Sequence, residues 1–97
     1  MKFTVDELLA WASQHEHDDW ATLVRRIPFR YHVTGPGIEY IPSSGTPRNV
    51  PHSELASFCD EVQESGSFSP GKYPDRWHKS YSLPLIQRFL QARGQRS

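Results

Sequence analysis

The sequence predicts an α+β domain in which helices flank a small antiparallel sheet. Apolar residues recur at helical spacing near both ends of the chain, and two short alternating segments separated by Gly35-Pro-Gly37 lie in the middle. The 97 residues suffice for a single domain, residues 1–97, and not for two independent cores. Three Trp, four Tyr and five Phe predict a core rich in aromatic side chains.

The first helix is expected over residues 5–14. Thr4 and Glu7 have the spacing of a capping box, in which the threonine hydroxyl accepts a bond from a backbone N–H and the glutamate reaches back. The apolar residues that follow fall on one helical face. They are Val5, Leu8, Leu9 and Ala12.

A second short helix is expected between the polar segment His15–Asp19 and Pro28. Asp18 or Asp19 can cap it, and Pro28 ends it because residues before proline avoid the helical region. Four apolar residues recur at helical spacing between these limits: Trp20, Leu23, Val24 and Ile27. The sequence therefore predicts two N-terminal helices.

The centre of the chain is predicted to form an antiparallel hairpin. Residues 29–34 alternate bulky apolar and polar side chains, as a half-buried strand does. Gly35-Pro-Gly37 is typical of a turn, and residues 38–42 form the second strand. A third short strand is an option near residues 48–50, which would place Pro42–Pro47 at a connection between strands.

Two C-terminal helices are expected. Pro51 or His52 opens the first of them, and Ser65-Gly66 closes it because glycine is common just past a helix end. Its apolar face holds Leu55, Phe58, Cys59 and Val62. The loop over residues 67–77 follows, and its three aromatic residues are expected to fix it against the core.

The second C-terminal helix is predicted to begin after Ser82, which can cap it. Pro84 then lies in the first turn, where proline is tolerated, and Gly94 ends the helix. Its buried face is predicted to hold Leu83, Ile86, Phe89 and Leu90.

No segment has the uninterrupted apolar run of a signal peptide or a membrane span. Cys59 is the only cysteine, so no internal disulfide can form, and its place on an apolar helix face predicts an inert core residue. The sequence is therefore expected to belong to a cytoplasmic protein without membrane association.

Charge is unevenly distributed along a chain whose formal net charge is zero. Residues 1–24 hold one lysine against five acids, a balance of −4, and residues 25–70 hold four arginines against five acids, a balance of −1. Residues 71–97 hold six cations against Asp75 alone, a balance of +5. A chain polarised in this way can present a basic end to an anion while the whole molecule remains neutral.

Two groups of chemically active residue types are not expected to form sites. His15-x-His17-x-Asp19 matches a ligand run of binuclear metal hydrolases, but such a site needs further ligands and the other histidines are scattered. Asp75, His78 and Ser80 are the residue types of a catalytic triad, yet three residues in one short stretch rarely reach the required geometry. No metal ion, cofactor or catalytic residue is therefore predicted.

The segment Pro42–Arg48, PSSGTPR, has two interpretations. Successive N–H groups around the Ser-Ser-Gly turn can bind an anion, and nearby side chains add donors for phosphate oxygens. These side chains belong to Ser43, Ser44, Thr46 and Arg48. The alternative is a β-turn between strands, in which Gly45 provides a positive φ and the hydroxyls satisfy the backbone.

A second stretch favours anion binding. Cations and aromatic residues are interleaved over residues 72–81, as they are in surfaces that follow a nucleic-acid backbone and stack its bases. The cations are Lys72, Arg76 and Lys79, and the aromatics are Tyr73, Trp77 and Tyr81. The alternative is that the aromatics are buried and the cations are ordinary solvated charges.

Four motifs follow one another in order within residues 38–86: PSSGTPR at 42–48, Phe58, GSFSPGKY at 66–73 and SYSLPL at 80–85. Their order and spacing resemble a small, largely uncharacterised bacterial module with the pattern PSSGxxR … GSFxPxxY … SYxxxL. Such modules occur as stand-alone small proteins, including products of mobile gene cassettes, and beside nuclease-like domains. The resemblance covers about half of the chain and implies, by analogy, contact with nucleic acid.

The sequence therefore predicts a small, non-enzymatic binding protein. Its expected ligand is nucleic acid or another polyanion, held by the Ser43–Arg48 loop and the Lys72–Lys79 segment. The alternative is a protein-interaction module or a homo-oligomeric adaptor that uses the surplus aromatic residues and the acidic N-terminal region. A small hydrolase is the poorest interpretation, because no nucleophile and base converge in the sequence.

Overall fold

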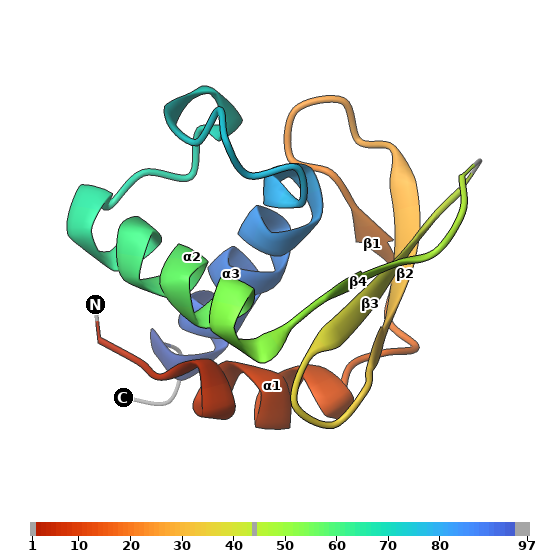
Figure 1. Ribbon diagram of the computed structural model, residues 1–97, viewed down its shortest axis with the longest axis horizontal. Coiled ribbons are helices and arrows are strands. Elements are labelled where there is room, and N and C mark those ends of the chain that lie inside the picture. Colours follow the sequence, from red (N-terminus) through yellow and green to blue (C-terminus); the bar gives the residue numbers. More distant parts are fainter. Residues whose placement is uncertain (1, 44, 95–97) are drawn as a thin grey trace.

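The computed structural model describes residues 2–43 and 45–94, and within them the chain forms three α-helices and a four-stranded antiparallel sheet (Figure 1). The helices are α1 (Val5–Ser13), α2 (His52–Ser65) and α3 (Lys79–Gly94), and a 3₁₀ turn, η1 (Pro70–Lys72), precedes α3. The strands are β1 (Trp20–Ala21), β2 (Pro28–Val33), β3 (Ile38–Pro42) and β4 (Arg48–Val50). The predicted α+β class is confirmed.

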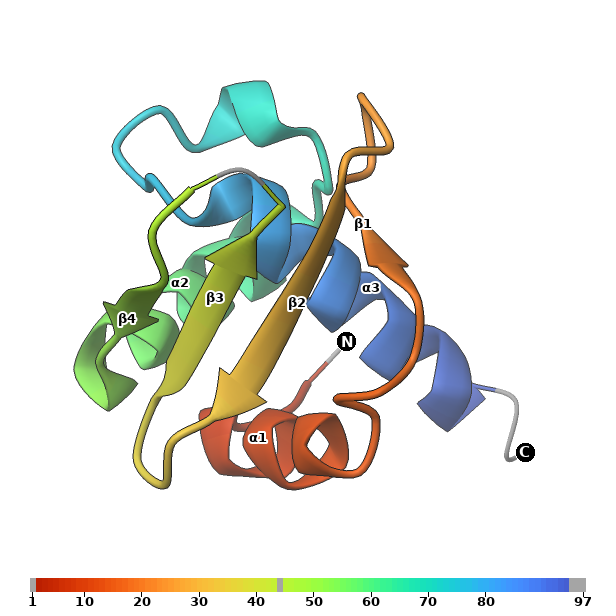
Figure 2. The same cartoon turned by 90° about the vertical axis from the view of Figure 1, so that its right-hand side faces the viewer.

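The strands lie in the order β1-β2-β3-β4, so each pairs with its neighbour in the sequence. β2 and β3 form the predicted hairpin, and β4, which the sequence left as an option, pairs with β3. Side chains alternate along β2: Phe29 and Tyr31 are buried, while Arg30 and His32 are exposed. Figure 2 shows the helices on one side of the sheet, so that the opposite face remains open.

The second predicted N-terminal helix is wrong. Residues 20–27 instead form β1 and a tight turn that leads into β2. Trp20 lies opposite Phe29, its Nε1–H donates a 2.9 Å hydrogen bond to the carbonyl of His15, and its ring packs edge-on against Tyr31. Burial of this tryptophan between aromatic neighbours outweighs the weak helical preference of a short apolar pattern.

The turn over residues 22–27 is closed by three hydrogen bonds. The N–H of Thr22 donates to the carbonyl of Ile27 (3.0 Å), and the N–H of Ile27 donates to Thr22 Oγ1 (3.0 Å). The N–H of Arg26 donates to the Thr22 carbonyl (3.1 Å). Arg26 itself has a φ of 57°, which residues other than glycine seldom adopt. Val24 and Ile27, predicted to share a helical face, are instead 72% and 41% exposed.

The first and middle helices follow the sequence prediction closely. Thr4 and Glu7 form the capping box at the start of α1, with reciprocal bonds of 2.8 and 3.1 Å. α2 ends at Gly66, whose φ of 68° is left-handed and whose N–H donates to the Val62 carbonyl at 2.8 Å. The predicted apolar face of α2 is buried, with Phe58 at its centre.

α3 begins at Lys79, ahead of the predicted cap Ser82. The N–H of Ser82 donates to the carbonyl of His78 at 2.8 Å, so a helical turn is already closed at this point. Ser82 is buried within the helix, and Pro84 consequently lies inside the helix and not in its first turn.

The core between the sheet and the helices is aromatic, as the composition predicted. The ring of Phe29 lies 6.1 Å from that of Tyr40, and the ring of Phe58 lies 5.1 Å from that of Tyr73. Tyr73 therefore fixes the 67–77 loop to the core as expected, whereas Trp77 is 38% exposed. None of the helices in the described ranges is both long and apolar enough to cross a membrane.

Candidate functional site

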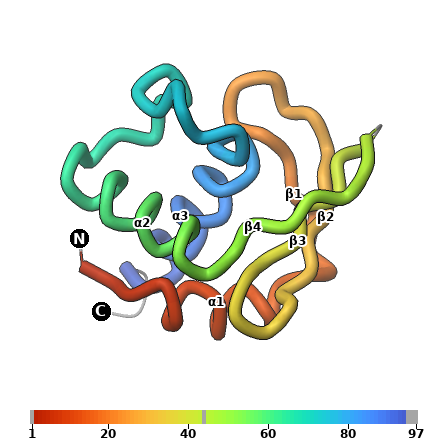
Figure 3. Tube along the Cα trace, in the orientation of Figure 1, coloured from red at the N-terminus to blue at the C-terminus, as the bar shows by residue number. Residues whose placement is uncertain are grey.

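Three connections between secondary-structure elements gather at one end of the molecule (Figure 3). They are the turn at residues 22–27, the β3–β4 connection (residues 43 and 45–47) and the loop at residues 67–78. We call this region the loop end. It contains both segments that the sequence predicted to bind an anion, so the geometry of these segments decides which side chains can act together.

Arg48 and Trp77 join the two predicted segments. Arg48 lies opposite Tyr40 in the β3–β4 pair, so its side chain points to the helix-covered side of the sheet. Its Cζ atom lies 3.9 Å from the centre of the Trp77 ring, a cation–π arrangement between two exposed residues. The PSSGTPR loop and the basic segment are therefore neighbours in space.

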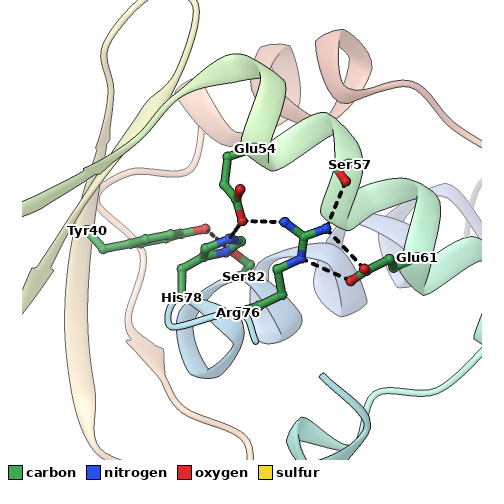
Figure 4. Close-up of polar contacts among 7 residues, drawn as sticks. All are labelled: Tyr40, Glu54, Ser57, Glu61, Arg76, His78 and Ser82. Atoms are coloured by element: carbon green, nitrogen blue, oxygen red, sulfur yellow. Dashed lines mark hydrogen bonds and ion pairs between the residues drawn. The ribbon is translucent and has the colours of Figure 1, made fainter. Parts of the chain in front are cut away.

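Arg76 does not face solvent as the sequence predicted for a phosphate ligand. Its guanidinium donates to Glu54 Oε2 (2.6 Å) and makes a paired contact with the two oxygens of Glu61 (3.1 and 3.0 Å), as Figure 4 shows. A further bond of 2.8 Å reaches Ser57 Oγ. The bonds to Glu61, with those to Glu54, raise the pKa of Arg76. Two carboxylates thus neutralise the guanidinium and occupy most of its donors.

A buried chain of hydrogen bonds starts at the same glutamate. His78 Nε2 lies 3.1 Å from Glu54 Oε2, His78 Nδ1 lies 2.8 Å from Ser82 Oγ, and the Tyr40 hydroxyl lies 2.7 Å from the same Ser82 oxygen. We assign a neutral His78 with its proton on Nε2. In this tautomer the Nε2–H donates to Glu54, the Ser82 hydroxyl donates to Nδ1, and Tyr40 donates to Ser82, so each of these groups has a partner. Burial lowers the pKa of His78, while the bonds from His78 and Arg76 hold the pKa of Glu54 below its ordinary value.

Glu54, His78 and Ser82 have the residue types of a hydrolase triad, but their surroundings do not suit catalysis. Ser82 and His78 are fully buried, and the Tyr40 hydroxyl occupies the Ser82 oxygen. A nucleophile must reach a substrate, so this arrangement acts as a structural network. His78 bonds neither Asp75 nor Ser80, the partners that the sequence offered. The i, i+4 spacing of His78 and Ser82 is the one signal that could have revealed their contact.

The β3–β4 connection carries the predicted hydroxyl donors. Ser43 and Thr46 are exposed, and Ser44 lies outside the described residues. A Cβ added at Gly45 would lie 3.4 Å from Pro42 Cβ, an ordinary contact.

The predicted lysines lie in different surroundings. Lys72 borders a depression that it shares with three carboxylates, from Glu61, Glu64 and Asp75. Lys79 borders a different groove, between the 22–27 turn, η1 and the first turns of α3. We call it the turn–helix groove. Of the two lysines, Lys79 is the one whose surroundings favour an anion.

The turn–helix groove has a volume of about 480 Å³. Arg25 borders it from the turn and Lys79 from the start of α3. Its remaining lining consists of hydroxyl-bearing, apolar and glycine residues: Thr22, Leu23, Val24, Ile27, Ser69, Pro70, Gly71, Ser80, Tyr81, Leu83 and Pro84. No carboxylate occurs among these described lining residues. An anionic group in the groove would therefore be attracted by Arg25 and Lys79 and would not be repelled by a negative side chain of the lining.

The sequence prediction missed Arg25, Val24 and Ile27 as surface residues of this groove. The cause was the wrong helix over residues 20–27, which assigned both aliphatic residues to a helix face. A basic pair, Arg25-Arg26, separated from Pro28 by Ile27 alone, was the available signal for an exposed turn.

The histidine run near the N-terminus has local partners. His15 Nδ1 lies 3.0 Å from Asp18 Oδ2, and its ring stacks on Trp11 with 4.2 Å between the centres. In the described part of the chain, no three His, Cys, Asp or Glu side chains are grouped to hold a metal ion. Cys59 is buried, and burial raises the pKa of its thiol to about 12.

Comparisons of this chain with models of protein families, with curated proteins and with solved structures give no match.

Proposed function

We propose that this chain is a non-enzymatic binding module whose loop end binds the phosphate groups of a nucleic acid or a similar polyanion. The observation that carries the proposal is the position of Arg48 over Trp77, which brings the PSSGTPR loop beside the basic segment. Arg48 and Lys79 supply the charge, and the hydroxyls of Ser43 and Thr46 add neutral donors.

The charge balance at the loop end supports this assignment. Arg76 is neutralised by Glu54 and Glu61, and Lys72 lies among acids, so neither belongs to the proposed contact surface. Within the described ranges, no ion pair involves Arg48 or Lys79. Cations that no carboxylate neutralises are the ones that can exchange solvent counterions for phosphate groups.

Fluorescence anisotropy with labelled DNA and RNA oligonucleotides tests the proposal, provided that the salt concentration is varied. Arg48→Ala and Lys79→Ala should each weaken binding and lower the slope of log affinity against log salt by roughly 0.7–0.9. Arg30→Ala is the matched control, because Arg30 is exposed on the open face of the sheet. Failure of the unaltered protein to bind either nucleic acid at low salt contradicts the proposal.

A protein-interaction role is the second candidate, and one observation favours it. Val24 and Ile27 are exposed apolar side chains of the 22–27 turn that border the same groove. Contiguous apolar surface often marks a site for another protein, including a second copy of the same chain. Sedimentation velocity over a range of protein concentrations tests self-association, and Val24→Ser should abolish any dimer that forms through this surface.

A further inference from the structure

The 22–27 turn holds apolar side chains out of the core by a defined backbone structure. Three hydrogen bonds close the turn, and the left-handed Arg26 directs the chain back into β2. Val24 is consequently 72% exposed at the edge of the turn–helix groove. An ordered turn that presents an aliphatic side chain to solvent, beside a groove, is suited to contact a ligand.

The groove combines two kinds of surface. Arg25 and Lys79 approach it from different elements, whereas Val24, Ile27 and Pro70 form apolar walls. Its volume of about 480 Å³ lies within the range of pockets that bind small organic groups. A fitting ligand therefore has an anionic group joined to a flat or apolar body.

The groove shares one cation, Lys79, with the surface proposed to bind phosphate. Lys79 borders the groove and follows Trp77 by two residues, and Trp77 lies under Arg48. A strand whose phosphates contact Arg48 and Lys79 can thus extend one further unit toward Arg25. Bases of a duplex are paired and stacked inside the helix, so only an unpaired base can enter such a groove.

We propose that the turn–helix groove binds one unstacked nucleotide of a single-stranded nucleic acid. Its phosphate lies between Arg25 and Lys79, and its base contacts Val24, Ile27 and Pro70. This inference rests on the proposed function and narrows its ligand class from any polyanion to a single strand.

The test compares three labelled probes by fluorescence anisotropy: oligothymidylate, a DNA hairpin duplex and heparin. Oligothymidylate should bind roughly tenfold more tightly than the duplex at equal salt, because burying about 55 Å² of apolar surface between the base and the aliphatic walls contributes a factor of this size. The double variant Val24→Ser/Ile27→Ser should lose this preference and keep the salt slope, since it removes no charge. Arg25→Ala should lower both the affinity and the slope.

Two matched controls accompany these variants. Ile41→Ser removes an aliphatic side chain from the open face of the sheet, and Arg30→Ala removes a cation there. Neither should change the preference for the single strand. Both altered aliphatic residues of the groove are exposed, so thermal melting should show that the double variant folds normally.

The possible results separate the two proposals. If all three probes bind equally well and Val24→Ser/Ile27→Ser does not change their binding, the inference that the groove binds a nucleotide is wrong. The proposal that the loop end binds a polyanion is then retained. Absence of binding to every probe at low salt overturns the proposed function as well. If a peptide of alternating Glu and Phe binds as tightly as oligothymidylate and depends on Val24 and Arg25, the groove belongs to a protein partner and the inference is wrong.

Discussion

The Nε2 atom of His78 lies 3.1 Å from the Oε2 atom of Glu54 (Figure 4). The same carboxylate oxygen accepts a 2.6 Å bond from Arg76, so one side chain of α2 holds two residues of the segment before α3. Trp77 lies between these two residues in the sequence and is exposed beneath Arg48. The buried network and the proposed contact surface are therefore two sides of one short segment.

The first prediction concerns the pH dependence of folding. Burial lowers the pKa of His78, so the unfolded chain, with a histidine pKa near 6.5, takes up the proton first. Stability from this residue is complete above about pH 6.5 and is lost as the pH falls toward the lower pKa of the folded state. Urea titrations at pH values from about 7 to about 5 should show this decline in the free energy of unfolding. In His78→Gln the free energy of unfolding should fall less steeply with pH than in the unaltered protein.

The decisive quantity for His78 is the difference between the unaltered protein and His78→Gln in the slope of unfolding free energy against pH. The rest of the chain is the same in both proteins, and any constant loss of stability in His78→Gln cancels from the slope of unfolding free energy against pH. Identical slopes in the two proteins would mean that His78 is not held neutral by its surroundings.

A second prediction compares two carboxylates of α2 that both contact Arg76. Glu54→Gln removes a negative charge whose carboxylate pairs with Arg76 and also accepts a hydrogen bond from His78. The substitution should therefore cost roughly 1.5–3 kcal/mol of unfolding free energy. Glu61→Gln leaves Arg76 its bond to Glu54 and should cost about 1 kcal/mol or less. Urea denaturation at neutral pH measures both, and an equal or reversed order would contradict the central role of Glu54.

Much of the fold follows from local sequence signals, because these signals act over a few residues. The Thr4–Glu7 capping box, the Gly35–Gly37 turn and the Ser65-Gly66 helix end all form as predicted or within a residue or two. Residues 20–27 failed because Trp20 gains more from pairing with β2 than from helical spacing. That gain depends on a partner strand and is invisible in a local pattern.

The candidate site was harder to predict for the same reason. Interleaved cations and aromatics drew attention to residues 72–81, and within that segment Trp77 is exposed beside Arg48. The sequence could not show that Arg76 is neutralised, since its partners Glu54 and Glu61 are 22 and 15 residues away on α2. Charge counts along a chain do not distinguish a paired cation from a free one.

A third prediction separates two glycines by their backbone conformation. Gly66 has a φ of 68°, so Gly66→Ala should cost about 1–2 kcal/mol even though the space around it is open. Gly71 has no positive φ, and an added Cβ would have Ser69 Oγ as its nearest neighbour at 4.0 Å. Gly71→Ala should therefore change stability by less than about 0.5 kcal/mol in thermal or urea unfolding. A loss at Gly71 as large as the loss at Gly66 would show that the cost does not come from the left-handed backbone.

The last prediction tests what Arg48 contributes beyond its charge. Arg48→Ala should weaken binding of different nucleic-acid sequences to a similar extent, because phosphate contacts position a ligand without reading its bases. Arg48→Lys keeps the charge and should keep the salt slope, but a lysine lacks the planar group that stacks on Trp77. Both variants should therefore shift the indole N–H resonance of Trp77 in NMR spectra, assigned with Trp77→Phe, while only Arg48→Ala should lower the slope. If the Trp77 resonance does not shift in either variant, Arg48 does not stack on Trp77, and this contact does not join the PSSGTPR loop to the basic segment. An unchanged slope in Arg48→Ala would remove Arg48 from the phosphate contacts.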